Sequence, residues 1–355
     1  MSSIEGLFKI LRYFGKRAIV LFITVVISVY LTIVIANAGG YVDKIAETEI
    51  RMNVAMHVKD DPTLRGYTEE QKLNIIESRV RNELKRRGLD KPFFIRSLYH
   101  LKNAIVLNLG TAMYMTSDSG SMQVKNIILE RLPLTILLFT TATVISFFLN
   151  LYLGLKLSRK YGSFWDKLVV YLSPTSVIPG WFYGIFLIMI FYSWLHILPP
   201  GGFVDFPPPP TTLGYILNVL KHMILPLSAW IISPLFLGIY SERNFFLIFS
   251  TEDYVEVAKA KGLPAKDIER KYILRPALPP IITSFALTVI SSWMGAIVTE
   301  SIFNWPGLGM VLARAIGLFD APVIVGVTVI YAYLLAGTVL ILDFIYALID
   351  PRVRI

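Results

Sequence analysis

A charged segment between two apolar stretches contains the residues best suited to binding a partner. In this segment, residues 251–275, Thr251 can cap the start of a helix, and acidic residues follow in the first turn, where they are favoured. Gly262 predicts the end of this short helix, and a second helix would then run to Pro279 and Pro280. Small residues on the first helix would let another backbone approach closely. The pattern predicts a docking helix for a soluble protein, and an ordinary solvated loop is the alternative.

A second candidate site is the sequence ESIFNWPGLG, at residues 300–309. A carboxylate at membrane depth costs about 2.5–3.5 kcal/mol, so we expect Glu300 to face a cavity or a partner. Trp305, Pro306 and Gly307 predict a sharp turn. We expect this segment to line or cap the outer mouth of a translocation path, and an interfacial turn anchored by Trp305 is the alternative. The candidate gate residues are Glu300, Phe303, Trp305, Pro306 and Gly307.

The sequence contains no residue pattern typical of an enzyme. It has neither a phosphate-binding loop of the form G-x-x-x-x-G-K-[ST] nor a G-x-S-x-G motif. The four histidines have no metal-ligand spacing, and the absence of cysteine excludes disulfides, thiolate metal sites and cysteine nucleophiles. We therefore expect a protein that is not an enzyme and holds no cofactor or metal of its own.

The candidate sites must be positioned by elements that cross a membrane. Of the 355 residues, 55% are hydrophobic and 17% are charged, and the mean hydropathy is +0.60, which is typical of a polytopic membrane protein. Uncharged apolar runs of about 17–25 residues predict six spans. These spans are residues 18–38, 134–155, 177–195, 223–240, 281–298 and 322–342. Pro226 and Pro234 should kink or break the fourth span.

The distribution of basic residues predicts the orientation of the spans. Seventeen Lys and Arg residues flank the spans on one side, and two lie in the short loops on the other, which places both termini and residues 251–275 in the cytoplasm. The net charge of +9 therefore reflects topology, and no nucleic-acid partner is expected. Residues 1–17 predict an amphipathic helix on the inner membrane surface, with a disordered tail as the alternative. Asp343 should reach the inner interface or pair with a cytoplasmic cation, and Asn150 should join two helices.

Residues 39–131 then form an extracytoplasmic insert between the first two spans. It contains a charged helical stretch, residues 69–87, that ends at Gly88. An apolar stripe at helical spacing runs along this stretch: Leu73, Ile76, Val80 and Leu84. An insert of about 90 residues can form a small packed unit with a thin core.

Several motifs resemble those of ABC importer permeases in the dipeptide, oligopeptide and nickel branch. Glu256-Val257-Ala258, with Gly262 after it, resembles the EAA…G signature of the loop that contacts the ATPase subunit, although Val257 replaces the usual Ala. The other matching sequences are RRGLDKP at 86–92, NLG at 108–110, ERLPLTILL at 130–138, ESIFNWPGLG at 300–309 and LIDPRVR at 348–354. The resemblance extends over nearly the whole chain.

This resemblance implies an all-α polytopic membrane protein with the six-helix fold of type I ABC importer permeases, in which residues 132–355 form the core. It implies that ATPase coupling involves Tyr254, Glu256, Ala258, Lys261 and Gly262. The implied partners are a second, homologous permease, two cytoplasmic ABC ATPase subunits and an extracytoplasmic solute-binding protein, in the lipid bilayer of a prokaryotic cell membrane. ATP and Mg would bind to the ATPase subunits.

The transported solute stays open at this point. Relatives in this branch import peptides, oligosaccharides or nickel, and we rank these solutes in that order. A solitary channel or ion-coupled carrier is one alternative, although the spans lack the charged residues of an ion relay. A membrane receptor whose insert binds a partner is another, and it would make Glu256 and Gly262 dispensable.

Overall fold

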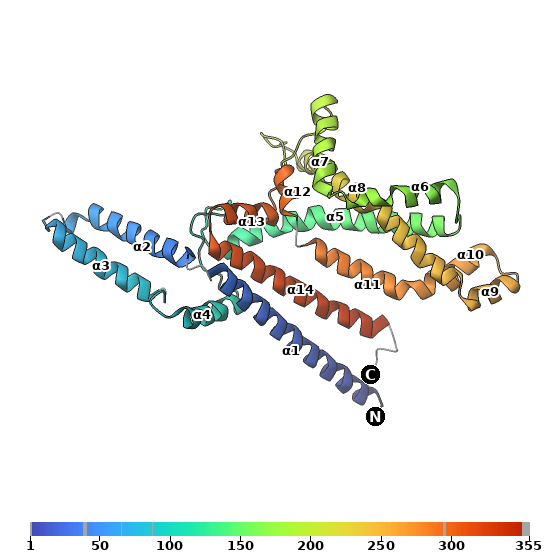
Figure 1. Ribbon diagram of the computed structural model, residues 1–355, viewed down its shortest axis with the longest axis horizontal. Helices are drawn as coiled ribbons and strands as arrows, with labels where there is room; N and C mark the ends of the chain where they lie inside the picture. The colour runs from blue at the N-terminus through green and yellow to red at the C-terminus, as the bar shows by residue number, and fades with distance from the viewer. Residues whose placement is uncertain (1, 38–40, 65, 87, 294–295, 350–355) are drawn as a thin grey trace. The chain divides into compact units, whose positions relative to one another are not determined.

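The computed structural model of the chain describes residues 2–37, 41–64, 66–86, 88–293 and 296–349 (Figure 1). In these ranges the chain is almost entirely helical, with one isolated β-bridge between Thr111 and Gln123, so the all-α prediction is confirmed. The α-helices are α1 (Ser2–Asn37), α2 (Tyr41–Asp60), α3 (Glu69–Arg86), α4 (Phe93–Ile105), α5 (Val124–Ser158), α6 (Phe164–Leu172), α7 (Gly180–Ile188), α8 (Thr212–Ser250), α9 (Asp253–Ala260), α10 (Ala265–Asp267), α11 (Arg275–Ser292), α12 (Ile297–Ile302), α13 (Leu308–Gly317) and α14 (Ala321–Ile349).

The chain packs into two units. The first comprises residues 128–314 together with the described parts of 1–17 and 334–355. The second comprises the described parts of 18–127 together with residues 315–333. The two candidate sites, residues 251–275 and 300–309, both lie in the first unit.

Within the described residues, five helical stretches are long and apolar enough to cross a membrane: Arg12–Ile35, Val124–Ser158, Thr212–Ser250, Ala265–Val289 and Ala321–Asp343. A sixth span is formed if the bent pair Phe164–Val177 and Gly180–Trp194 counts as one. The six predicted spans then all have counterparts.

The third span differs from the prediction of a single run over residues 177–195. It begins earlier, with α6, and the chain bends by 95° between Val177 and Gly180. The bend lies at Ile178, which is extended (φ −71°, ψ 123°) because the following Pro179 disfavours a helical conformation there. The segment ends in a π-helix, Met189–Trp194.

Pro226 and Pro234 were expected to kink or break the fourth span, and they do not break it; Pro279 and Pro280, expected to end a helix, do not end one. Helix α8 continues through Pro226 and Pro234 to Ser250. Similarly, Pro279 and Pro280 lie inside α11, because Ala277 and Ile281 on either side of them pack against Phe246 of α8. Tertiary packing therefore overrides the local preference of proline. The fifth span also ends earlier than residue 298, since α11 stops at Ser292.

No separate surface helix forms over residues 1–17, because α1 is one helix from Ser2 to Asn37. Gly15 alone is too weak to stop it, since one glycine costs a helix about 1 kcal/mol relative to alanine. Near the start of the span, Arg17 donates from Nε to Asp343 Oδ2 at 2.6 Å. The predicted pairing of Asp343 with a cation is confirmed, whereas Asp350 lies outside the described residues.

In the insert, α2 and α3 pack against each other. A capping box starts α3, because the Thr68 amide donates to Gln71 Oε1 and the Gln71 amide donates to Thr68 Oγ1. The helix ends at Gly88, whose φ of +69° favours glycine, as the sequence predicts. Of the predicted stripe, Val80 is buried but Leu73 is exposed, so the core is thin. Helix α5 already starts at Val124, eight residues before the predicted core boundary at 132.

Candidate functional site: an exposed helix between spans and a buried glutamate cap

The first candidate, α9, starts one residue later than the sequence suggests. Thr251 is the C-terminal cap of α8, and its hydroxyl donates to the carbonyls of Leu247 (3.3 Å) and Ile248 (3.0 Å). Glu252 is the N-cap of α9. The prediction that Thr251 caps the following helix is therefore wrong, because α8 extends ten residues beyond the predicted end of its span.

The C-terminus of α9 is a Schellman motif built around Gly262. The Gly262 amide donates to the Lys259 carbonyl (2.9 Å), and the Leu263 amide donates to the Ala258 carbonyl (3.3 Å). Gly262 has φ +71°, which L-residues with a side chain rarely adopt. Leu263 packs against the buried Ala258, which supplies the apolar contact typical of this motif. The predicted turn at Gly262 is confirmed.

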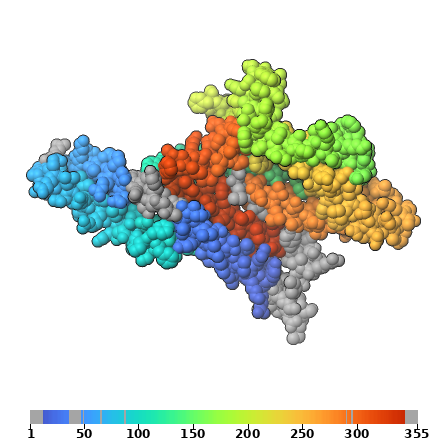
Figure 2. All heavy atoms as spheres, viewed as in Figure 1, coloured from blue at the N-terminus to red at the C-terminus, as the bar shows by residue number. Residues whose placement is uncertain are grey.

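One face of α9 is buried and the other is open. Val255 and Ala258 are buried against Ile268 of the π-helix Ile268–Leu274 that follows α10. The exposed residues include Tyr254, Glu256, Val257, Lys261 and Gly262. Among the predicted coupling residues, Ala258 alone faces into the chain. Figures 1 and 2 show α9 and α10, in orange, at one end of the first unit.

Two ion pairs fasten the surroundings of α9, and neither was predicted. Asp166 of α6 accepts two hydrogen bonds of 2.7 Å from the guanidinium of Arg243 in α8, and both side chains are buried. A carboxylate with bidentate arginine contacts has its charge compensated, which burial requires. Arg159, in the connection between α5 and α6, pairs with Glu269 of the π-helix after α10. The partners are far apart in sequence, so no local pattern indicates them.

The second candidate site is a buried network around Glu300. This residue lies in α12, between candidate spans, and is fully buried. Its Oε1 accepts from the Thr135 hydroxyl at 2.9 Å, and its Oε2 accepts from the Met310 amide at 2.9 Å. Thr135 in turn accepts from the Leu308 amide at 2.7 Å. The carboxylate thus lies at the N-terminus of α13, where amide donors favour negative charge.

Burial raises the pKa of the Glu300 carboxyl to about 7, and hydrogen bonds from Met310, Thr135 and Gly309 oppose this rise. The two glycines of the segment make room for the carboxylate. A Cβ at Gly307 would lie 2.5 Å from Glu300 Oε1, and one at Gly309 would lie 2.9 Å from Oε2. The glutamate and the two glycines of the motif therefore form one packed unit.

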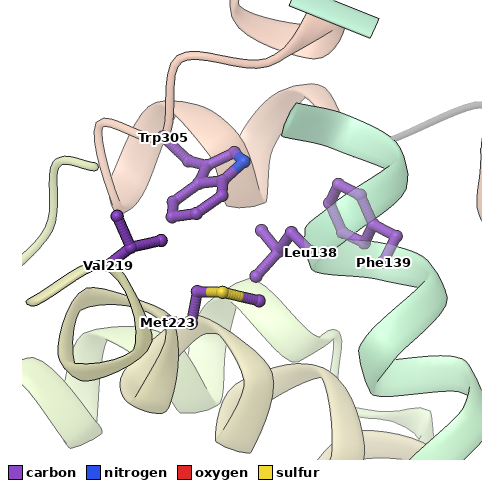
Figure 3. Packing of buried hydrophobic residues seen from close by; sticks show 5 residues of the cluster. All are labelled: Leu138, Phe139, Val219, Met223 and Trp305. Atoms are coloured by element: carbon purple, nitrogen blue, oxygen red, sulfur yellow. The ribbon is translucent and has the colours of Figure 1, made fainter. Parts of the chain in front are cut away.

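The aromatic residues of this segment are also buried. Trp305 packs with Leu138, Phe139, Val219 and Met223 from α5 and α8, as Figure 3 shows. Its indole N–H donates to the Leu134 carbonyl at 3.0 Å. Phe303 packs against Leu225 and Ala229 of α8. The segment therefore joins α12 to α5 and α8, and Pro306 alone among the five predicted gate residues is partly exposed.

The loop between the third span and α8 is hydrogen-bonded to the same segment. The Gly202 amide donates to the Phe303 carbonyl at 2.7 Å. His222 of α8 is hydrogen-bonded through Nδ1 to the Gly201 carbonyl (2.8 Å) and through Nε2 to Asp205 Oδ1 (3.0 Å). Donation from Asn218, and then from His222, lowers the pKa of the Asp205 carboxyl. No functional spacing was found among the histidines in the sequence. These contacts of His222 were missed because its partners lie 17 and 21 residues before it.

The predicted helix contact of Asn150 is confirmed, because its side chain lies against Gly238 of α8. Among the described residues, no three His, Cys, Asp or Glu side chains gather where they could hold a metal ion. The described part of the chain thus offers two features for function: an exposed helix between spans and a buried cap that ties helix ends together.

These features define a polytopic helical membrane protein. A family model described as binding-protein-dependent transport system inner membrane component matches residues 150–355, and the chain belongs to that family. It is therefore a transport subunit of the ABC importer type, as the motifs indicated. An oligopeptide transport system permease protein of Bacillus subtilis (strain 168) is 31% identical over 269 residues, covering 75% of this chain and 82% of the relative.

Other curated relatives have similar coverage. A probable D,D-dipeptide transport system permease protein of Escherichia coli (strain K12) is 32% identical over 299 residues, covering 77% of this chain and 84% of the relative. A di/tripeptide transport system permease protein of Pseudomonas aeruginosa (strain UCBPP-PA14) is 32% identical over 286 residues, covering 76% and 84%.

Proposed function

We propose that this chain forms part of the translocation path of an ATP-driven importer for dipeptides or oligopeptides. The relatives named above are permeases of dipeptide, di/tripeptide and oligopeptide transport systems, which supports peptides as the solute. The chain would work with a second permease, two ATPase subunits and an extracytoplasmic binding protein. ATP and Mg would bind to the ATPase subunits and not to this chain.

The exposed face of α9 is the observation that carries the coupling proposal. A helix that projects between two spans, with Tyr254, Glu256 and Val257 exposed, offers a surface for a cytoplasmic ATPase. Apart from Gly262 and its two neighbours, no described residue has an atom within 4 Å of where a Cβ at Gly262 would be, so a partner can approach its backbone closely. The excess of basic residues in the same loop supports a cytoplasmic position for it and for both termini.

Coupling would follow from the way α9 is attached. Its buried face packs on the π-helix Ile268–Leu274, which leads directly into α11, and Glu269 in this π-helix pairs with Arg159. A movement of the ATPase subunits would therefore displace α9 together with the inner ends of several spans. Such a movement changes the equilibrium between inward-open and outward-open packings only if the ATPase binds the two states with different affinity.

We further propose that residues 300–309 act at the outer gate as its rigid part. Because Glu300, Phe303 and Trp305 are buried, they would act by holding helix ends together and not by contacting the solute. An opening of the path at this end would then move α12, α13 and the start of α5 as one body.

Replacement of Gly262 by asparagine tests the coupling role. Asparagine tolerates a positive φ better than other residues with a side chain, so Gly262→Asn keeps the turn but fills the space in front of it. Gly162→Asn is a matched control, because Gly162 has φ +75°, lies in another connection and also has no atom within 4 Å of a Cβ. Both variants would be reconstituted with the ATPase subunits, second permease and binding protein.

We expect Gly262→Asn to abolish peptide uptake and solute-stimulated ATP hydrolysis while Gly162→Asn retains both. Normal coupled uptake by Gly262→Asn would refute the docking role. Screening the purified binding protein against peptides, oligosaccharides and nickel would test the solute separately. If it binds an oligosaccharide or nickel and no peptide, the peptide assignment is wrong, whatever the result for Gly262.

A further inference from the structure

Helix α4 of the second unit has an exposure pattern opposite to that of a helix on a water-facing surface. It buries Arg96 and Ser97, which are 9% and 1% exposed. Several of its large apolar or aromatic side chains are exposed: Phe94 (64%), Tyr99 (54%), Ile95 (51%) and Leu98 (46%). On a surface in contact with water, burial of the apolar side chains would be favoured instead.

The buried polar groups of α4 are satisfied within the chain. Arg96 donates from Nη1 to the Leu89 carbonyl at 3.2 Å, and the Ser97 hydroxyl donates to the Phe94 carbonyl at 2.8 Å. Charged residues at membrane depth face the protein interior in the same way. The inverted pattern is therefore a stable arrangement if the exposed face of α4 contacts something apolar.

The C-terminal end of α4 lies at the depth of a span. The Tyr333 hydroxyl of α14 donates to the Ile105 carbonyl at 2.6 Å. Tyr333 is twelve residues into the candidate span that starts at Ala321, which corresponds to about 18 Å along the helix axis. The span is 23 residues long, so Ile105 lies beside its middle.

The chain then returns to the end of the same span. Just before α14, Asp320 Oδ2 accepts from the amides of Met113 (3.0 Å) and Tyr114 (2.9 Å). Eight residues after Ile105, the backbone is thus back at the start of α14. Helix α4 and the chain that follows it accordingly enter and leave the depth of the bilayer without crossing it.

We propose that α4 lies in one leaflet of the bilayer, with Phe94, Ile95, Leu98 and Tyr99 among the lipid acyl chains. The exposed Lys91, just before α4, would reach the headgroups, as long basic side chains do at membrane interfaces. The same unit already presents a surface of this kind, since α1 exposes Ile27 (54%) and Leu31 (53%) along its candidate span. Given the proposed orientation, the leaflet is the outer one.

Spin-label accessibility in the reconstituted complex tests this placement. The chain has no cysteine, so single-cysteine variants can be labelled directly. Phe94→Cys and Leu98→Cys would be compared with Ile27→Cys in the span of α1, and with Leu73→Cys, which is 60% exposed on α3. Collision with oxygen, which concentrates in hydrocarbon, is measured against collision with a water-soluble nickel chelate.

We expect positions 94 and 98 to match position 27, with an oxygen-to-chelate ratio several-fold higher than at position 73. A ratio equal to that at position 73 would show that α4 faces water and would overturn the proposal. Low collision with both reagents would show that another protein subunit covers α4, which would also overturn it. The measurement does not depend on transport or on the identity of the solute.

Discussion

Residues 253–263 and residues 300–309 both combine a glutamate with glycine at short spacing, but the glycines meet different surroundings. In front of Gly262 the chain leaves open space, whereas a Cβ at Gly307 would lie 2.5 Å from both Glu300 and Thr135. Glu256 is exposed, and Glu300 is fully buried. Under the proposed coupling role, one glycine keeps a surface clear for a partner, while the other lets the chain close upon itself. Substitutions should therefore affect coupling at the first segment and stability at the second.

Removal of the buried carboxylate should have the largest effect on stability. Glu300→Ala leaves the Thr135 hydroxyl and the Met310 amide without their acceptor, and each unsatisfied buried group costs about 1–3 kcal/mol. We expect a loss of about 3–5 kcal/mol, measured as a fall in melting temperature and in the yield of folded protein in detergent. The conservative Glu300→Gln retains one oxygen acceptor and should lose about half as much. If Glu300→Ala melts like the parent, the cap does not stabilise the fold.

Crowding of the same cap should have the next largest effect. Gly307→Ala places a methyl group against Glu300 and Thr135 in a packed site, and overpacking of this kind costs about 1–3 kcal/mol. Gly317→Ala is the matched control, because no atom lies within 4 Å of a Cβ there and alanine favours a helix. We expect a lower melting temperature for Gly307→Ala alone. Equal melting of the two variants would contradict the close packing of residues 300–309.

The sequence is informative about these segments where the determinants are local. The turn at Gly262 follows from the residues of α9 itself, because a Schellman motif needs a residue in the left-handed region three or four positions after the helical carbonyls that accept its hydrogen bonds. The spans follow from hydropathy, since bilayer thickness sets a minimum apolar length. Both features were therefore predictable without tertiary information.

The burial of Glu300 was not predictable in this way, because its acceptor role depends on Thr135, which lies 165 residues earlier. The same holds for α6. The charge of Asp166 makes this run look too polar for a span, and the residue that compensates the charge, Arg243, lies 77 residues later. Thr251 was assigned to the wrong helix because α8 continues beyond the apolar run. Phe246, in this continuation, packs against Ala277 and Ile281. In each case a distant partner decides what the local pattern leaves open.

Two valines of α9 separate its two faces, and Val257→Ala gives the smallest predicted effect. Val255 is fully buried against Ala258 and Ile268, and Val255→Ala should cost about 1.5–2.5 kcal/mol through lost burial and a small cavity. Val257, two residues later, is 53% exposed, and Val257→Ala should change the melting temperature by an amount equivalent to less than about 0.5 kcal/mol.

The expected effect on affinity for the ATPase subunits is reversed: Val257→Ala should change this affinity, and Val255→Ala should not. Val257→Ala alters the surface offered to the ATPase without disturbing the fold, so a change in the ATPase affinity of the stable, purified chain would be a property of the interface. Titration of the ATPase subunits against each variant, at a temperature where both are folded, measures this affinity. A change for Val255→Ala and none for Val257→Ala would mean that α9 acts through its buried face, and the distinction between an open, partner-binding segment and a closed, structural one would fail.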